Sequence, residues 1–324
     1  MKNGYLMIIV ILTLSLLLTP LLAVGDKTVK DNIPQENTSS APTKKEGEIG
    51  VYISESGETV YLSVFDYICG VVAAEMPAVY EIEALKTQAV CAYTYLCKKL
   101  KTNAEEKSYD ITDDFKTDQA YIGPEKRKER WGENFDLYET KIADAVRAVE
   151  KKAITYNEEI IFAAYHAISA GKTENALNVW GGDYPYLVPV PCEGDLLAKD
   201  YLSEVIIAPA DFENALKAKN AEPHGRCEEY IGALEKSDSG TVLKITLCGK
   251  EFKGSEVREM FSLRSSNFDL LYTEEKGFCF TVRGYGHGVG MSQNGANYLA
   301  LSGKNYEEII KHFYSGVEIV EYDF

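Results

Sequence analysis

A proline directly after an apolar segment determines where one helix of this chain must end. Residues 71–76 read Val-Val-Ala-Ala-Glu-Met, and Pro77 follows them. Proline lacks an amide hydrogen and pushes the residue before it out of the α region, so we expect the helix to end near Glu75. A second helical segment begins at about Glu81, and its small residues suit close packing against the first helix. The sequence therefore predicts a tight corner between two helices, with Glu75 at the corner.

The position of Glu75 bears on its protonation state. It is predicted to lie at the negative end of a helix dipole, among the apolar side chains of Val71, Val72 and Met76. Both features favour the neutral carboxylic acid. An acid that stays protonated near neutral pH can donate its proton to the leaving oxygen of a glycosidic bond. The same pattern also fits a solvent-exposed residue at the end of a helix, and the local sequence leaves both interpretations open.

An uncharged segment near the N-terminus suggests a membrane span. The 20 residues Tyr5–Val24 carry no charge, and as a helix they would be about 30 Å long, enough to cross a bilayer. We predict that residues 5–24 form a transmembrane signal anchor and residues 1–4 a short cytoplasmic end. A signal peptide cleaved within Leu22–Gly25 is the alternative, but the apolar run is long for such a peptide and its small-residue site is poor.

The segment behind the apolar run differs from it in composition. Residues 25–48 are rich in Lys, Glu, Asn, Ser and Thr, and they include Pro34 and Pro42. This composition predicts a flexible linker. Residues 49–324 are then predicted to form an extracytoplasmic domain that a single membrane pass holds at the membrane.

The charge balance argues against a nucleic-acid partner. The chain carries 50 Asp and Glu against 34 Lys and Arg, a formal net charge of −16, whereas nucleic-acid binding needs a basic face. The seven cysteines form no compact disulfide framework. Because most of them lie inside predicted helices or strands, we expect them to be buried small apolar residues.

Hydrophobic periodicity over residues 49–324 predicts helices and strands in mixed order, and hence the α+β class with antiparallel strands around a cleft. Ser63 is expected to cap the helix that carries Glu75. Residues 103–135 are polar and irregular, and we predict a surface insertion there. The predicted elements are hairpins around 55–57 and 156–159, helices near 64–75, 81–100, 138–150, 211–218, 256–261, 291–302 and 305–313, and strands near 160–165, 229–236, 241–248, 268–273 and 278–283.

A second chemical feature is the segment Gly284–Gln293, which begins with a glycine at every other position and contains His287. It follows a predicted strand and precedes a predicted helix. Glycines remove side chains from a loop, so that the backbone and one projecting residue can approach a ligand. The segment lacks the Lys-Ser/Thr pair of a phosphate loop. A tight turn without a binding role explains the glycines equally well.

Four residues have side chains that suit zinc, namely His166, Cys192, His224 and Cys227. His224 and Cys227 are close enough in sequence to begin a site, but no second close pair accompanies them. The other interpretation gives them separate roles as a packed histidine, free thiols and exposed loop residues. Zinc at these positions is a hypothesis, and no other part of the sequence requires a cofactor.

Three ordered blocks resemble the stage II sporulation protein D family, which includes proteins described as amidase enhancers. Residues 71–90 are similar to the AAEMP and ALKAQAV signature of the family, Ser262–Phe268 to its SLRSTNF block, and Gly284–Gly295 to its GxGHGVGMSQxGA block. The resemblance covers the chain from about residue 50 to its end.

The resemblance implies an activity and a setting. In that family the glutamate of the AAEMP block is the catalytic acid of a lytic transglycosylase, which corresponds to Glu75 here. The implied substrate is peptidoglycan, preferably with stem peptides removed, cut between N-acetylmuramic acid and N-acetylglucosamine to leave 1,6-anhydro ends during forespore engulfment. The implied partners are stage II sporulation proteins P and M. A non-catalytic activator of a cell-wall amidase is the alternative function.

The resemblance also suggests which residues contact the glycan. Polar side chains able to hydrogen-bond sugar hydroxyl or acetamido groups are Gln88, Ser169, Arg264, His287, Ser292 and Gln293. Arg264 fits a structural clamp on backbone carbonyls equally well. The chain departs from the family at Tyr93, where an arginine is usual.

Overall fold

The structure is a computed structural model that describes residues 44–102 and 108–324. The predicted anchor (5–24) and most of the predicted linker (25–48) lie outside these residues. Within the described ranges, no helix has the length and apolar character that crossing a bilayer requires. The first strand begins at Glu48, where the linker is predicted to end.

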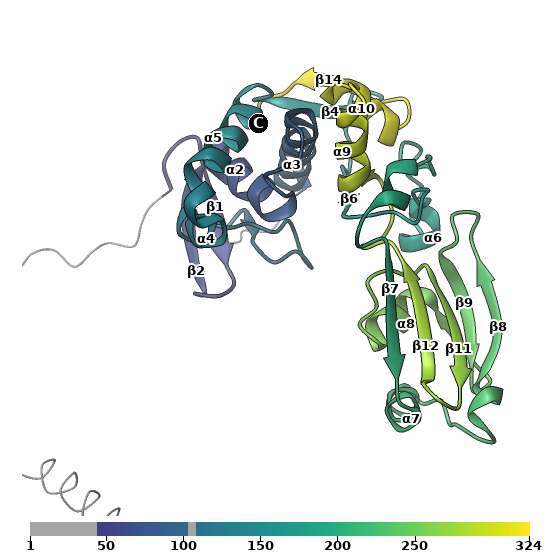
Figure 1. The fold of residues 1–324 in the computed structure, drawn as a ribbon. Helices are drawn as coiled ribbons and strands as arrows, with labels where there is room; N and C mark the ends of the chain where they lie inside the picture. The colour runs from purple at the N-terminus through teal and green to yellow at the C-terminus, as the bar shows by residue number, and fades with distance from the viewer. Residues whose placement is uncertain (1–43, 103–107) are drawn as a thin grey trace, which may run out of the picture. The chain divides into compact units, whose positions relative to one another are not determined.

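The first of two hydrophobic cores is mainly helical. Its central helix is α3, which contacts α2, α5, α9 and α10 and lies between α2 and α9 in Figure 1. Because α3 is surrounded in this way, more than half of its residues are buried, including its small residues Ala84, Ala89 and Ala92. The helices of this core are α2 (Val64–Glu75), α3 (Ile82–Thr102), α5 (Phe135–Arg147), α9 (Gln293–Leu301) and α10 (Tyr306–Phe313).

Two small sheets flank these helices. One has the order β2-β1-β3, in which β1 pairs antiparallel with β2 and parallel with β3. The other has the order β14-β4-β5 and is antiparallel. Both predicted hairpins are therefore confirmed. The strands are β1 (Glu48–Ile53), β2 (Glu58–Ser63), β3 (Ile111–Thr112), β4 (Lys152–Tyr156), β5 (Glu159–Ile160) and β14 (Glu318–Glu321).

The ends of α2 follow from its sequence. At the N-terminus the Ser63 hydroxyl accepts a hydrogen bond from the Asp66 amide at 3.0 Å, as an N-cap should. At the C-terminus Met76 adopts an extended conformation ahead of the proline. The predicted helix end at Glu75 is confirmed.

The described part of the predicted surface insertion over residues 103–135, residues 108–135, is mostly exposed or half-buried, and the bounds of the insertion stay a prediction. It is less irregular than expected, because it forms α4 (Pro124–Trp131) and the short helix η1 (Gly132–Asn134), and it contacts α2 where the Ile122 amide donates to the Gly70 carbonyl. A side chain on Gly70 would place its Cβ only 2.1 Å from the Tyr121 ring, so the glycine is needed for the close approach. The segment also holds one buried charge, because Arg127 pairs with Glu139 on α5.

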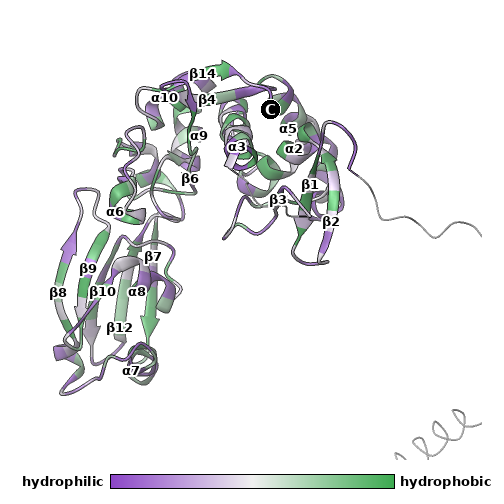
Figure 2. Ribbon diagram, turned by 180° about the vertical axis from the view of Figure 1, so that it is seen from behind, coloured by the Kyte–Doolittle hydropathy of each residue, from purple (hydrophilic) through white to green (hydrophobic). Residues whose placement is uncertain are grey.

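The second core lies between strands and two helices, and Phe212 is at its centre, stacked on Phe278 with ring centroids 3.7 Å apart. Its sheets have the orders β11-β12-β7 and β10-β9-β8 and are antiparallel. Figure 2 shows apolar residues along β7 and β9. The elements are β7 (Leu202–Ile207), α7 (Pro209–Ala218), η3 (Cys227–Tyr230), β8 (Ile231–Lys236), β9 (Val242–Leu247), β10 (Lys250–Lys253), α8 (Gly254–Met260), β11 (Phe268–Thr273) and β12 (Gly277–Arg283).

Short elements hold the remaining loops in place. The strand β6 (Tyr165–His166) pairs in parallel with β13 (Met291–Ser292). Single bridges join Ile168 to Tyr285 and Ser265 to Gly286. These pairings fix the glycine-rich segment against β6. Two short helices, α6 (Ala176–Trp180) and η2 (Glu193–Leu197), lie in the intervening chain.

The fold is a mixture of helices and mainly antiparallel strands, so the predicted α+β class is confirmed. All seven cysteines are described and free, and five of them are buried, which agrees with their predicted apolar role. The predicted strand over 160–165 is wrong: only residues 159–160 and 165–166 pair there, in two different sheets.

Candidate active site

Glu75 opens onto a cleft with a volume of about 790 Å³. The cleft wall comes from the end of α2, the segment after β3, the chain around β6, helix α6, helix α8 and the glycine-rich segment. Residues far apart in sequence therefore meet at one site. The lining residues are Ala74, Glu75, Tyr95, Phe115, Lys116, Thr117, Asp118, Gln119, Phe162, Ala163, Ala164, Tyr165, His166, Ala167, Trp180, Tyr184, Arg258, Tyr285, Gly286, His287 and Gln293.

The Glu75 carboxyl group is half-buried and held by three donors. Its Oε1 accepts hydrogen bonds from the Ala120 amide at 3.2 Å and the Tyr165 hydroxyl at 3.4 Å. Its Oε2 accepts one from Gln293 Nε2 at 3.4 Å. Burial raises the pKa of Glu75 above its ordinary value, and these long hydrogen bonds offset the effect only in part. The site thus favours the protonated acid.

Two of the predicted binding residues have different positions relative to the cleft. Gln293, the first residue of α9, lines it. Gln88 is fully buried on α3 and is not part of the wall. Its Oε1 accepts a hydrogen bond from Gln293 Nε2 at 3.2 Å. Gln88 therefore orients Gln293, which in turn contacts Glu75.

Tyr165 and Gln119 support Glu75 but were not predicted from the sequence. The Tyr165 hydroxyl lies 3.0 Å from Gln119 Oε1, so its hydrogen is shared between this oxygen and Glu75. Gln119 Nε2 donates to the Ala92 carbonyl and to the Tyr67 hydroxyl, both at 3.3 Å, which orients the amide. No local sequence pattern marks either residue, because both act through contacts made by the fold.

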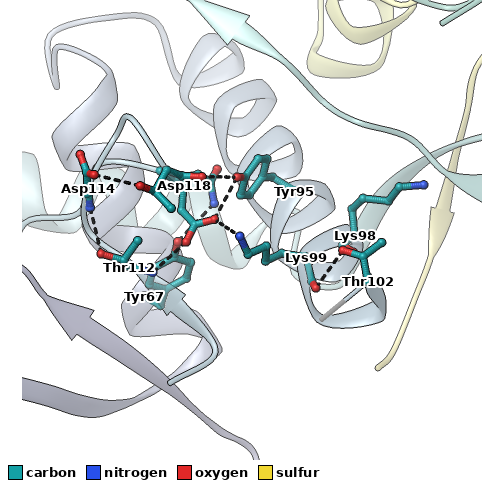
Figure 3. Close-up of polar contacts among 10 residues, drawn as sticks. Tyr67, Tyr95, Lys98, Lys99, Thr102, Thr112, Asp114 and Asp118 are labelled. Carbon is teal, nitrogen blue, oxygen red and sulfur yellow. Dashed lines mark hydrogen bonds and ion pairs between the residues drawn. The ribbon is translucent and has the colours of Figure 1, made fainter. Parts of the chain in front are cut away.

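Asp118 is the second carboxylate in the cleft lining, and its oxygens are already bound. Its side chain is only 1% exposed and lies 2.6 Å from Lys99 Nζ. It also accepts hydrogen bonds from the Tyr95 hydroxyl at 3.1 Å and the Thr112 amide at 3.0 Å. Figure 3 shows these groups converging on Asp118. Asp118 therefore anchors its loop to α3.

The loop anchored by Asp118 presents an aromatic ring to the cleft. Phe115 is 71% exposed although it lines the cleft. Asp114 stabilises the turn by accepting hydrogen bonds from the Lys116 amide at 3.0 Å and the Thr117 hydroxyl at 2.9 Å. These bonds lower the pKa of Asp114. Phe115 is thus an exposed ring on a well-anchored loop.

The glycines of the segment Gly284–Gln293 allow it to pack on β6. A Cβ on Gly290 would lie 2.1 Å from the Ala164 carbonyl oxygen, and one on Gly286 would lie 2.7 Å from the Cβ of His166. Both glycines also have positive φ angles. The glycines therefore let the backbone approach the chain around β6, and the packing carries His287 into the cleft wall. The approach of this backbone to a ligand stays a prediction.

His166 and His287 line the cleft and are neutral near pH 7. His287 Nδ1 accepts a hydrogen bond from the Val289 amide, and His166 Nδ1 donates one to the Val289 carbonyl, each at 3.1 Å. Burial lowers the pKa of His287 to about 3 and that of His166 to about 4. The positive charge of Arg258 contributes to both shifts. His166 Nε2 then carries a lone pair, and it has no hydrogen-bond partner in the described structure.

Ser169 and Ser292, predicted to bind glycan, lie outside the cleft wall and are buried. They bind instead to Asp195, a fully buried carboxylate. The Ser169 amide donates to it at 2.7 Å, the Ser292 hydroxyl at 2.9 Å and Asn294 Nδ2 at 3.1 Å. Asp195 therefore joins three loops behind the site, a role that no sequence motif indicates.

Arg264 is a clamp, which is one of its two predicted roles. It is not part of the cleft lining. Its guanidinium donates to the Asp200 carbonyl at 3.4 Å and lies 4.6 Å from the centroid of the Tyr285 ring. The arginine that lines the cleft is Arg258 on α8, which was not predicted.

The four predicted zinc ligands do not form a site. All four are described, and the described residues hold no group of three or more His, Cys, Asp or Glu side chains placed to bind a metal ion. His166 lies on β6 and Cys192 belongs to the first core. Cys227 packs against the second core, and His224 is exposed on the preceding loop. The described structure therefore does not bring these four side chains together.

Aromatic rings form one wall of the cleft. Phe162 contacts Trp180 edge-on at a centroid distance of 5.6 Å and Tyr184 at 6.1 Å. Trp180 also lies 5.0 Å from the His287 ring and is 42% exposed. Exposed aromatic faces beside hydrogen-bonding groups suit ligands that have both apolar and polar faces.

The site is thus a partly aromatic cleft whose described lining has one available carboxylic acid, which defines a candidate general-acid site. The chain is also similar to known proteins. A family model described as "Stage II sporulation protein" matches residues 53–156. The chain is 33% identical to stage II sporulation protein D of Bacillus amyloliquefaciens over 295 residues, which is 89% of this chain and 84% of that protein.

A second relative is matched over its whole length. Stage II sporulation protein D of Bacillus subtilis is 32% identical over 339 residues, covering 100% of this chain and 97% of that protein. The chain therefore belongs to the stage II sporulation protein D family. It is also 26% identical to the "Amidase enhancer" of Bacillus subtilis, over 78% of this chain and 40% of that protein. The resemblance drawn from the three sequence blocks is confirmed.

Tyr93, where the sequence departs from the family, does not contact the cleft. It lines a separate cavity of about 360 Å³ together with Phe65 and Phe324. Its hydroxyl donates to the Tyr322 carbonyl at 2.6 Å. Tyr93 therefore joins α3 to the C-terminal segment of the chain and takes no direct part in the site.

Proposed function

We propose that this protein is a peptidoglycan lytic transglycosylase in which Glu75 is the only catalytic carboxylate. It would cut glycan strands between N-acetylmuramic acid and N-acetylglucosamine and leave 1,6-anhydromuramic ends during forespore engulfment. Membership of the stage II sporulation protein D family supports the sporulation setting. The observation that carries the proposal is the presence of one available carboxylic acid in the cleft.

Ordinary glycosidases need two carboxyl groups beside the scissile bond. The described cleft lining contains two, but Asp118 is enclosed by an ion pair and hydrogen bonds, so only Glu75 is available. The acidic residues nearest in sequence do not help. Glu81 is exposed outside the lining. Glu83 is also outside it, and its oxygens accept hydrogen bonds from Lys86 Nζ at 2.6 Å and the Tyr306 amide at 2.8 Å.

A single acid suffices when the sugar supplies its own nucleophile. Protonated Glu75 donates its proton to the glycosidic oxygen, and the bond between that oxygen and C1 of the muramic sugar breaks. The C6 hydroxyl oxygen of the same sugar forms the new bond to C1, and its proton passes to the Glu75 carboxylate. The acid is regenerated and no water is consumed. The raised pKa of Glu75 supports the first step.

The cleft also suits a polymer of sugar rings. Phe115 and Trp180 offer exposed aromatic surface to the less polar faces of pyranose rings. Gln293 and His287 can form hydrogen bonds with hydroxyl and acetamido groups. We further propose the family setting for this chain: anchorage through residues 5–24, an extracytoplasmic catalytic domain, and a complex with stage II sporulation proteins P and M. Catalysis in this scheme requires no cofactor.

A second candidate function is the stimulation of a separate cell-wall amidase without cleavage of the glycan. The similarity to a protein named "Amidase enhancer" favours it. In that case the cleft would bind glycan strands, and Glu75 would be a binding residue. The two functions predict different products and can be separated in one assay.

The assay incubates the full-length chain, in detergent micelles, with peptide-free glycan strands, with and without a chelator. Mass spectrometry identifies the new ends, and Glu75→Ala is run in parallel. We expect 1,6-anhydromuramic ends from the parent, unchanged by the chelator, and none from the variant. Reducing ends would instead indicate a hydrolase with a second carboxylate. No cleavage, together with faster peptide release by an added amidase, would identify an activator.

A further inference from the structure

We propose that Arg258 binds the free lactyl carboxylate of a peptide-free muramic sugar and so determines which glycan strands the cleft accepts. The inference rests on the proposed function, because it assumes a peptidoglycan strand in the cleft. It extends that function from the position of the acid to the recognition of the substrate.

Among the described residues, Arg258 is a cation in the cleft without an acidic partner. It is partly buried at the cleft end of the second core, and its Nε donates to the Leu263 carbonyl at 3.3 Å. The structure, over its described ranges, gives its two terminal nitrogens no acceptor and no carboxylate within ion-pair distance. Five other arginines of the described chain form ion pairs, such as Arg127 with Glu139, whereas Arg130 donates to the Ala73 carbonyl.

A second, independent observation concerns the neighbouring histidine. His166 lines the same cleft and is 4% exposed, and its buried Nε2 has no hydrogen-bond partner in the described chain. A buried polar atom left without a partner costs free energy, so a ligand that supplies a donor would be stabilised there. The lone pair of Nε2 can accept from a hydroxyl or acetamido N–H group. The two residues together offer a cation and an acceptor, which matches a sugar that carries both a carboxylate and such a donor.

The charges around Arg258 favour an anionic ligand. His166 and His287 are neutral because their pKa values lie at about 4 and about 3. Arginine itself stays charged in proteins. A partly buried guanidinium without a counter-ion has lost hydration that a bound carboxylate can replace with two parallel hydrogen bonds. The site is therefore incomplete until an anion binds.

The chemistry of peptidoglycan makes this contact selective. A muramic sugar freed of its stem peptide ends its lactyl group in a carboxylate. A sugar that still carries the peptide has an uncharged amide at that position, and N-acetylglucosamine has no carboxyl group at all. A stem peptide also ends in a carboxylate, so the same chemistry has a second source. Arg258 contact with the lactyl carboxylate would favour peptide-free strands.

The test measures the binding of full-length protein, in the Glu75→Gln background that prevents cleavage, to three substrates. These are peptide-free strands, the same strands after carbodiimide coupling to methylamine, which converts lactyl carboxylates to neutral amides, and strands with intact stem peptides. The substitutions compared are Arg258→Gln, Arg258→Lys, which retains the charge, and Arg147→Gln. Arg147 is a matched control because it lies outside the cleft and pairs with Asp144.

We expect Arg258→Gln to weaken binding of peptide-free strands by about 10- to 100-fold, the range for a hydrogen-bonded charged pair. Amidation of the strands should weaken their binding to the protein with Arg258 by the same factor. It should not weaken binding to Arg258→Gln any further, because the substitution and the amidation remove the same contact. The affinity of Arg258→Lys for peptide-free strands should lie between those of the parent and of Arg258→Gln. Arg147→Gln should bind these strands like the parent. Thermal unfolding of each variant separates loss of binding from loss of fold.

Two outcomes would overturn the inference: indifference of the Arg258 protein to amidation, or an Arg258-dependent preference for strands with intact stem peptides, which would assign the contact to a stem carboxylate. Neither bears on cleavage. Conversely, carboxylate-dependent binding through Arg258 without any anhydro product from the Glu75 protein would leave this inference intact and reject the transglycosylase. The two proposals can therefore fail separately.

Discussion

The two sides of the cleft differ in how completely their polar groups are paired. Around Glu75, three donors from Gln293, Tyr165 and Ala120 bind the carboxyl group, and Gln88 and Gln119 contact two of these donors, although the buried Gln88 Nε2 has no partner in the described chain. Around Arg258, the terminal guanidinium nitrogens and His166 Nε2 have no partner in the described chain. A preorganised site lowers the free energy of the transition state because its dipoles do not reorganise during the reaction. Unpaired groups, in contrast, are completed by the ligand.

The two sides also have different origins. Glu75 ends a helix of the first core, whereas Arg258 lies on a helix of the second. The difference suggests that one core holds the chemistry in a fixed geometry and the other supplies a recognition contact. The predictions below test this division, from the largest expected effect to the smallest.

Glu75→Gln should remove the chemistry and leave recognition intact. Loss of a positioned general acid should reduce the rate of cleavage about 100- to 10,000-fold, with glycan affinity nearly unchanged. Because burial raises the pKa of Glu75, the parent enzyme should be active below that pKa and lose activity as the pH rises through it. Initial rates of cleavage measured across a range of pH give both the rate loss of the variant and the pH dependence of the parent. Glu81→Gln is the matched control, since Glu81 is exposed and outside the cleft. Equal loss in both variants would remove Glu75 from its role.

Asp118→Asn should act on stability more than on catalysis. The substitution leaves Lys99 without its acidic partner at a site where Asp118 is 1% exposed. We expect the free energy of unfolding to fall by about 2–3 kcal/mol, somewhat less than the cost of breaking a buried pair, because Lys99 is partly solvated. Urea unfolding measures the change. Asp144→Asn, in an exposed pair with Arg147, should cost under about 1 kcal/mol. A rate loss as large as that of Glu75→Gln would show that Asp118 takes part in the chemistry.

His166→Gln should change how stability depends on pH. The folded pKa of His166 is about 4, below the value of about 6.5 expected in the unfolded chain. The stability that neutral His166 gives the folded protein is therefore fully present above pH 6.5. As the pH falls from there toward about 4, the free energy of unfolding decreases by up to about 1.4 kcal/mol per pH unit. The variant should have a shallower dependence over that window, measured by urea unfolding at several pH values. Unchanged slopes would mean that His166 is protonated in the native protein.

Trp180→Ala should weaken glycan binding modestly, by about 3- to 10-fold, which corresponds to the loss of one aromatic contact. The effect should appear in affinity, with the cleavage rate at saturating glycan unchanged, because Trp180 lies on the aromatic wall away from Glu75's donors. Leu177→Ala is the control on the same helix, since Leu177 is exposed but outside the cleft. A Trp180 variant that binds like the Leu177 variant would argue against a stacking role.

The parts of the site that were predicted from the sequence are those that local rules govern. Pro77 predicts the end of α2 at Glu75. The glycines single out the loop that carries His287, although its packing on β6 was not predicted. The rest depends on contacts between distant residues. Asp195 binds Ser292, which is 97 residues away, and no pattern in either segment reveals the pair.

Segment 108–135 shows the same dependence on distant contacts. Most of its polar side chains are exposed or half-buried, as its composition suggests, but Asp118 and Arg127 are buried in ion pairs. Composition alone cannot distinguish a solvated charge from one that is paired inside the protein, because both use the same residues. Arg258 was missed for the same reason: an unpaired cation is recognisable only when its surroundings are known.

The contact between Gln293 and Glu75 spans 218 residues of chain. A ribosome makes Glu75 long before it makes α9, and the contacts of α9 with α3 can form only after the C-terminal part of the chain has emerged. A partly synthesised chain thus carries its acid without the donor that fixes one of its oxygens. Under the proposed function, the complete general-acid site would therefore form only after the C-terminal part of the chain has been made.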